Sequence, residues 1–213
     1  NKYEKSFNIY LKRNDSFYEA NERSNRILVL SVTNDLIFNT ILGKFSKAIA
    51  DIEDANIIYF PFVKYSREIS RMAKSFKVSV YVNVAFLFVG TLLKNCLKIS
   101  RHMIEIQDGK YLESYAIDNI PIGKHIYDFV LRKDRIPGID KLKFSHRVSV
   151  FICLLYYHGI RDLLKKHNIR TVVTLDNVYI EGIVFEISRS LNLKMYTGFD
   201  INLLTLHLFE SHS

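Results

Sequence analysis

One segment of the chain, residues 120–132 with the sequence IPIGKHIYDFVLR, combines a glycine turn, an aromatic ring, a carboxylate and a guanidinium. Pro121 and Gly123 predict a turn that leads into a helix from about residue 124. On such a helix, Asp128 and Arg132 are four residues apart and share one face. The simplest interpretation is a surface ion pair worth about 0.3–0.5 kcal/mol. The functional interpretation is a carboxylate and a guanidinium at the mouth of a cleft.

A second group of polar residues follows segments that are predicted as buried strands. In open parallel sheets, ligands bind beyond the carboxyl ends of the strands, so residues at these positions are candidates for binding. Asp and Asn at such turns also cap helices, which is the competing structural explanation. The candidates are Asn34 and Asp35 after the first strand, Asn83 at the end of the third, and Asp176, Asn177, Tyr179 and Glu181 after the late strand.

Several common catalytic and nucleotide-binding motifs do not occur in the sequence. There is no GxGxxG after the first strand, no GxxxxGK[ST] loop, no GxSxG elbow and no HExxH pair. No Cys or His residues have the spacing of a metal site. We therefore expect no bound metal and no cofactor held by a glycine-rich phosphate loop.

The elements that would position these residues alternate between short apolar runs and amphipathic stretches. Strands alternating with helices indicate parallel pairing through right-handed crossovers. The predicted strands are 26–31, 56–60, 78–84, 170–175 and 193–196, and the predicted helices are 36–50, 64–76, 85–98 (buried), 124–132, 145–167 and 178–191. The fold class predicted is α/β, a Rossmann-like parallel sheet flanked by helices. Residues 1–25 are expected to be a poorly packed polar lead-in, and residues 26–213 a single domain.

Two stretches of the chain resemble a known family. The segment 122–132, IGKHIYDFVLR, is similar to the "iGdliYDxyLR" segment of bacterial surface and capsular polysaccharide biosynthesis proteins. Residues 172–183, VVTLDNVYIEGI, resemble that family's later strand, polar turn and helix entry, in the same order and with the same spacing. The chain departs from the family at Lys124, where the family has an acidic residue, and at Asp176, where a His is expected.

The resemblance implies a glycosyltransferase of the GT-B type, in which two Rossmann-like domains face a cleft. This chain would be the N-terminal, acceptor-side half, and the nucleotide-sugar donor would be bound mainly by a C-terminal domain. An inverting transferase needs a base for the acceptor hydroxyl. The candidate bases are Asp35, Asp128 and Asp176, and the candidate substrate-binding residues are Asn34, Asn83, Gly123, Tyr127, Arg132, Asn177, Tyr179 and Glu181.

The balance of charge is basic, with a formal net charge of +8. This charge favours an anionic partner. One expected partner is the anionic inner face of a membrane, where lipid-linked acceptors are found, so we expect a cytoplasmic protein with peripheral membrane contact. A non-catalytic module that binds a glycan or a protein is the main alternative. Nucleic acid is not expected, because no recognition motif or basic strand with interleaved aromatic residues occurs.

Overall fold

The computed structural model describes residues 2–18, 23–62, 66–175, 178–200 and 205–209. Its centre is a single sheet with the strand order β3-β2-β1-β4-β5-β6. The first five of these strands pair in parallel, and β6 pairs antiparallel to β5. The strands are β1 (Asn25–Ser31), β2 (Ala55–Pro61), β3 (Val80–Tyr81), β4 (Thr171–Val173), β5 (Lys194–Asp200) and β6 (Thr205–Phe209). The predicted α/β class and Rossmann-like sheet are confirmed.

The central strands are apolar on both faces because helices cover both sides of the sheet. Successive side chains of β1 point in opposite directions. Leu28 and Leu30 belong to one hydrophobic cluster, and Ile27 and Val29 belong to the other. All four side chains are fully buried, which explains why the run reads as continuously hydrophobic rather than alternating.

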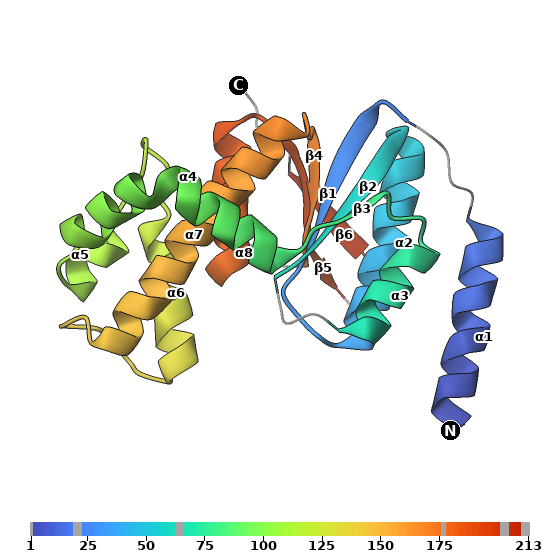
Figure 1. Ribbon diagram of the computed structural model, residues 1–213, viewed down its shortest axis with the longest axis horizontal. Coiled ribbons are helices and arrows are strands. Elements are labelled where there is room, and N and C mark those ends of the chain that lie inside the picture. The colour runs from blue at the N-terminus through green and yellow to red at the C-terminus, as the bar shows by residue number, and fades with distance from the viewer. Residues whose placement is uncertain (1, 19–22, 63–65, 176–177, 201–204, 210–213) are drawn as a thin grey trace.

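The helices form a layer on each side of the sheet (Figure 1). On one side lie α2 (Leu36–Ile52) and α3 (Arg67–Ser75), with α1 (Lys2–Phe17) outside them. On the other side lie α4 (Val84–Glu105), α7 (Phe144–Lys166) and α8 (Tyr179–Ser190), with α5 (Gly109–Glu113) and α6 (Gly123–Asp134) farther from the sheet. The long α7 passes beneath α4 and carries the chain back to β4.

The N-terminal segment corrects one expectation. Residues 1–25 were expected to pack poorly, but α1 lies against α3. Phe7 is only 8% exposed and belongs to the cluster beneath α2 and α3. The side-chain amide of Asn14 donates to the hydroxyl oxygen of Ser75 over 3.3 Å. Buried aromatic area together with polar bonds at the margin holds this helix in place, although its overall composition is polar.

The region after β2 corrects two further expectations. The third strand is limited to Val80–Tyr81, because it lies at the edge of the sheet and the chain turns into α4 at Asn83. The helix expected to be buried is instead long and largely exposed. Only one side of α4, which includes Ile99, packs against α7, so Leu93 and Leu97 on the opposite side are 78% and 83% exposed.

Candidate functional site

The sheet has a switch point between β1 and β4. From β1 the chain adds strands in one direction, through β2 to β3, and from β4 it adds β5 in the other direction. In folds of this kind, the crossovers leave on opposite faces at this point and open a crevice beyond the carboxyl ends of the two strands. The residues that follow Ser31 and Val173 therefore stand at the position where a ligand is expected.

On the β1 side, Asn34 and Asp35 are both exposed. The Asp35 carboxylate caps α2, because its Oδ1 accepts hydrogen bonds from the backbone N–H of Ile37 at 2.8 Å and of Phe38 at 3.0 Å. Such a cap contributes about 1 kcal/mol to stability. Asp35 therefore acts as a helix cap, as the competing structural explanation predicted.

The turn after β1 is held from below by a buried polar network that the sequence analysis missed. The side-chain amide nitrogen of Asn39 donates to the carbonyl oxygens of Thr33 at 2.8 Å and Asp35 at 2.7 Å. Its Oδ1 accepts from the hydroxyls of Ser31 at 2.6 Å and Tyr59. Every polar group of the amide is thus used, and the switch-point turn has one defined shape. The available signal was a polar Asn on the apolar face of the helix 36–50.

On the β4 side, a second buried hydrogen bond shapes the turn. The Thr174 hydroxyl donates to Oε1 of Glu181 over 2.8 Å, and Glu181 is only 4% exposed. Glu181 was a candidate for substrate binding, and the structure places its carboxylate beneath the turn. Tyr179 begins α8 with a φ of 52°, in the left-handed region that is uncommon for an aromatic residue. Asp176 and Asn177 lie outside the described residues.

The two segments that resemble the polysaccharide family meet at a junction between α6 and α8. The guanidinium carbon of Arg132 lies 4.6 Å from the centre of the Tyr179 ring, which is a cation–π contact. Near the other end of the junction, Nε2 of His125 lies 3.8 Å from Oε1 of Glu186. We call the group His125, Asp128, Arg132, Tyr179 and Glu186 the α6–α8 junction.

Asp128 is half-buried within this junction. Arg132 lies over the Tyr179 ring, and the ion pairs among the described residues do not include one between Arg132 and Asp128, so the simple interpretation of their spacing is wrong. Among the described residues, the Asp128 carboxylate has neither a hydrogen-bond partner nor an ion-pair partner within 4.0 Å. A half-buried carboxylate of this kind keeps its lone pairs available for an incoming hydroxyl.

His125 was not singled out by the sequence analysis. Its ring fits against α8 only because residue 182 is Gly: a Cβ at that position would lie 2.1 Å from Nδ1 of His125. Burial lowers the pKa of His125, and the nearby carboxylates of Glu186 and Asp128 act in the opposite direction. His125 therefore contacts Gly182 of the second family-like segment and interacts electrostatically with Asp128 of the first.

Three other candidates have clear structural contacts away from the switch point. A Cβ at Gly123 would lie 2.1 Å from the carbonyl oxygen of Leu112, so this glycine permits close packing against α5. The hydroxyl of Tyr127 accepts from the backbone N–H of Ile139 over 3.1 Å. Asn83 caps α4 by accepting from the backbone N–H of Ala85 at 3.0 Å. Gly123 and Tyr127 thereby fix the position of α6.

The described residues include no group of three or more His, Cys, Asp or Glu side chains that could hold a metal ion. Within the same described ranges, no helix has both the length and the apolar character needed to cross a membrane.

Comparisons of this chain with protein-family models, curated proteins and solved structures found no match.

Proposed function

We propose that this chain is a glycosyltransferase domain of bacterial surface polysaccharide biosynthesis, and that it binds the glycan or lipid-linked acceptor. The observation that carries the proposal is the α6–α8 junction. The segments 122–132 and 172–183, which resemble the polysaccharide family, lie far apart in the sequence and meet through Arg132 and Tyr179. They meet where the chain leaves β4, beside the switch point of a Rossmann-like sheet.

In this proposal Asp128 is the catalytic base. It removes the proton from an acceptor hydroxyl, whose oxygen attacks the anomeric carbon of the donor sugar. The bond from that carbon to the diphosphate breaks, and the nucleoside diphosphate leaves with the electron pair. Asp128 is preferred to Asp35, because the Asp35 carboxylate already caps α2, whereas Asp128 has no partner among the described residues.

Arg132 and Tyr179 are proposed to bind the acceptor. The guanidinium of Arg132 is exposed and can donate hydrogen bonds to hydroxyl or acidic groups of a glycan. Its contact with the Tyr179 ring restricts where it points, which lowers the entropy lost on binding. The nucleotide-sugar donor is proposed to bind mainly to a second, C-terminal domain. The basic charge of the chain would favour peripheral contact with the cytoplasmic face of a membrane.

The test uses the native protein recovered from its source cells, with substitutions introduced into the gene. Transfer of labelled sugar from a panel of nucleotide sugars into a lipid and glycan extract is measured. We expect transfer by the wild type and by Lys44→Gln, an exposed position on α2, and loss of transfer by Asp128→Asn. If the wild type binds glycan but transfers no sugar from any donor, the alternative of a non-catalytic binding module replaces this proposal.

A further inference from the structure

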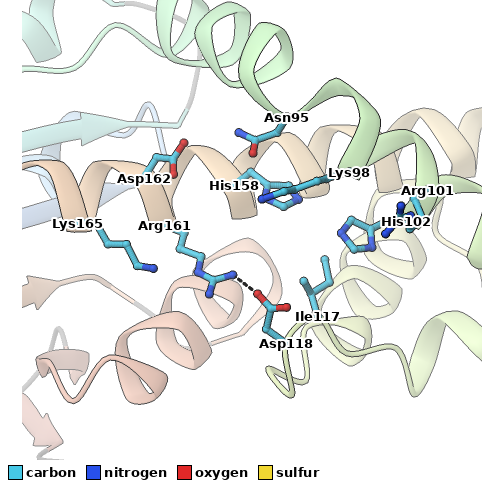
Figure 2. Close-up of a pocket in the computed structure, with 10 residues that line it drawn as sticks. All are labelled: Asn95, Lys98, Arg101, His102, Ile117, Asp118, His158, Arg161, Asp162 and Lys165. Carbon is cyan, nitrogen blue, oxygen red and sulfur yellow. Dashed lines mark hydrogen bonds and ion pairs between the residues drawn. The ribbon is translucent and has the colours of Figure 1, made fainter.

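A basic cavity of about 360 Å³ lies between α4 and α7, apart from the α6–α8 junction (Figure 2). One wall is formed by Lys98, Arg101 and His102 of α4, and the other by His158, Arg161 and Lys165 of α7. We call the hollow that these six residues line the basic cavity. In Figure 2, Arg161 and Lys165 of α7 lie toward one end of the cavity and Arg101 and His102 of α4 toward the other, with Asp118 beside Arg161.

The carboxylates near the cavity are already paired. Asp118 forms an ion pair with Arg161, and Asp162 forms one with Lys94 over 2.9 Å. In contrast, Lys98, Arg101 and Lys165 have no ion-pair partner within 4.0 Å among the described residues. Three cations around one hollow repel each other in the free protein. An anion placed between them would relieve this repulsion.

His158 supplies an independent sign of a missing ligand. The residue is only 7% exposed, and its Nε2 has no hydrogen-bond partner among the described residues. Leaving a buried polar group unpaired is unfavourable, because the group has lost its hydrogen bonds to water. Burial, together with the positive charges of neighbouring groups, lowers the pKa of His158 to about 4. The ring is therefore neutral at neutral pH, and an Nε2–H tautomer can donate to a ligand oxygen.

His102 is held in position beside His158. The Tyr115 hydroxyl donates its proton to Oε2 of Glu105 over 2.5 Å, so it accepts from Nδ1 of His102 over 2.7 Å. The two imidazole rings are stacked, with centres 5.6 Å apart and planes inclined by 21°. These two hydrogen bonds, from Tyr115 to Glu105 and from His102 to Tyr115, therefore fix the His102 ring. The stacked rings of His102 and His158 form an ordered wall of the cavity.

We propose that the basic cavity binds a phosphate-bearing ligand, with the phosphate oxygens on Lys98, Arg101 and Lys165 and one oxygen on Nε2 of His158. Phosphate suits this set because it offers several strong acceptors to the cations that line the cavity. A cavity of about 360 Å³ is larger than one phosphate, so a diphosphate or a phosphorylated sugar fits it better. The inference does not depend on sugar transfer at the α6–α8 junction.

The phosphate could belong to a soluble compound or to the head group of a lipid. Exposed apolar residues on α4 allow the lipid source to be tested. The exposed side chains of Leu93 and Leu97 lie on the same helix as Lys98 and Arg101. A helix with exposed apolar residues beside basic ones is typical of binding at a membrane interface.

The first experiment is calorimetric titration of the chain with inorganic pyrophosphate at low ionic strength and neutral pH. Lys98→Gln/Arg101→Gln is expected to weaken binding by about tenfold or more, since each change removes a charge-assisted hydrogen bond. The matched control is Lys44→Gln/Lys110→Gln, which removes the same charge from exposed positions outside the cavity. His158→Phe should weaken binding, and His158→Gln, which keeps a side-chain donor, should retain part of it. Circular dichroism checks that each variant is folded.

The second experiment measures co-sedimentation with vesicles of phosphatidylcholine alone or with added phosphatidic acid. A lipid head group as ligand predicts binding only to vesicles with phosphatidic acid, and Leu93→Ser/Leu97→Ser would then weaken vesicle binding but not pyrophosphate binding. A soluble ligand predicts pyrophosphate binding without vesicle binding. The proposal is overturned if neither probe binds, or if the control pair of substitutions weakens binding as much as the cavity pair.

Discussion

Arg132 lies with its guanidinium carbon 4.6 Å from the centre of the Tyr179 ring, and this contact joins two helices that meet beside the switch point of the sheet. Each residue comes from one of the two segments that resemble the polysaccharide family. The contact also explains why Arg132 does not pair with Asp128 one turn away. One aromatic ring thus orients the guanidinium and leaves the carboxylate of Asp128 without a partner among the described residues.

The first prediction concerns this contact. Arg132→Ala should raise the KM for the acceptor about tenfold, as expected for the loss of one charge-assisted hydrogen bond. The free energy of unfolding should fall by only about 0.5–1 kcal/mol, because the cation–π contact is partly exposed. Lys124→Ala, an exposed cation on the same helix, is the control and should change neither quantity. Equal effects of the two substitutions would show that acceptor binding depends only on the net positive charge of α6 and not on the position of Arg132.

The second prediction separates the two carboxylates that the structure describes. Asp128→Asn should lower the rate of transfer by about 10²–10⁴-fold, the range for loss of a general base, with little change in stability. Asp35→Ala should lower the free energy of unfolding by about 1 kcal/mol through loss of the α2 cap, and leave the rate nearly unchanged. Rate measurements and urea unfolding on both variants check this pair, and the reverse pattern would exchange the two roles.

The third prediction tests the packing of the α6–α8 junction. Gly182→Ala should destabilise the protein by about 1–3 kcal/mol, because the added Cβ would lie 2.1 Å from Nδ1 of His125. The double variant Gly182→Ala/His125→Ala should recover much of this loss, since the clashing ring is gone. A double-mutant cycle of unfolding free energies measures the coupling. Strict additivity would mean that the two residues do not meet.

The fourth prediction follows from His158. Its pKa is about 4 in the folded protein and 6.5 ordinarily, so the unfolded chain takes up a proton first as the pH falls. The stability that this group contributes is therefore fully present above pH 6.5 and is lost as the pH falls towards 4. The loss should be about 1–2 kcal/mol after allowance for solvent screening.

Other groups around His158 also titrate or carry charge, namely His102 and Lys98 from α4 and Arg161 and Asp162 from α7. The comparison is therefore between wild type and His158→Gln, each unfolded by urea at several pH values. The wild type should lose more stability than the variant over this interval. Parallel curves would contradict the assignment.

The sequence predicts the alternating elements and the parallel sheet well, because burial on both faces leaves continuous apolar runs such as residues 27–30. Prediction from the sequence fails where tertiary contacts decide whether a helix is buried or exposed. The polar composition of residues 1–25 concealed α1, whose packing depends on a few residues such as Phe7. The apolar composition of 85–98 indicated burial, yet α4 contacts its neighbours along only one side.

Prediction of the α6–α8 junction from the sequence is limited in the same way by tertiary contacts. The sequence identifies Asp128, Arg132 and Tyr179 by type and spacing, but their mutual arrangement depends on how α6 packs on α8. A sequence pattern cannot distinguish Asp128, which has no partner within the described part of the chain, from Asp35, whose carboxylate caps a helix, since only the hydrogen-bond partners differ. The basic cavity was not foreseen, because its walls come from 95–102 and 158–165, which meet only in the folded chain.

The most direct test of the central claim is to map where an acceptor binds on the native protein. Amide chemical shifts are recorded while an oligosaccharide of the source's own surface polysaccharide is added. We predict shifts centred on Arg132, Tyr179 and the turn after β1, and their loss in the Arg132→Ala variant. Shifts centred elsewhere, or no shifts in a folded protein at saturating oligosaccharide, would contradict the claim that the α6–α8 junction is the acceptor site.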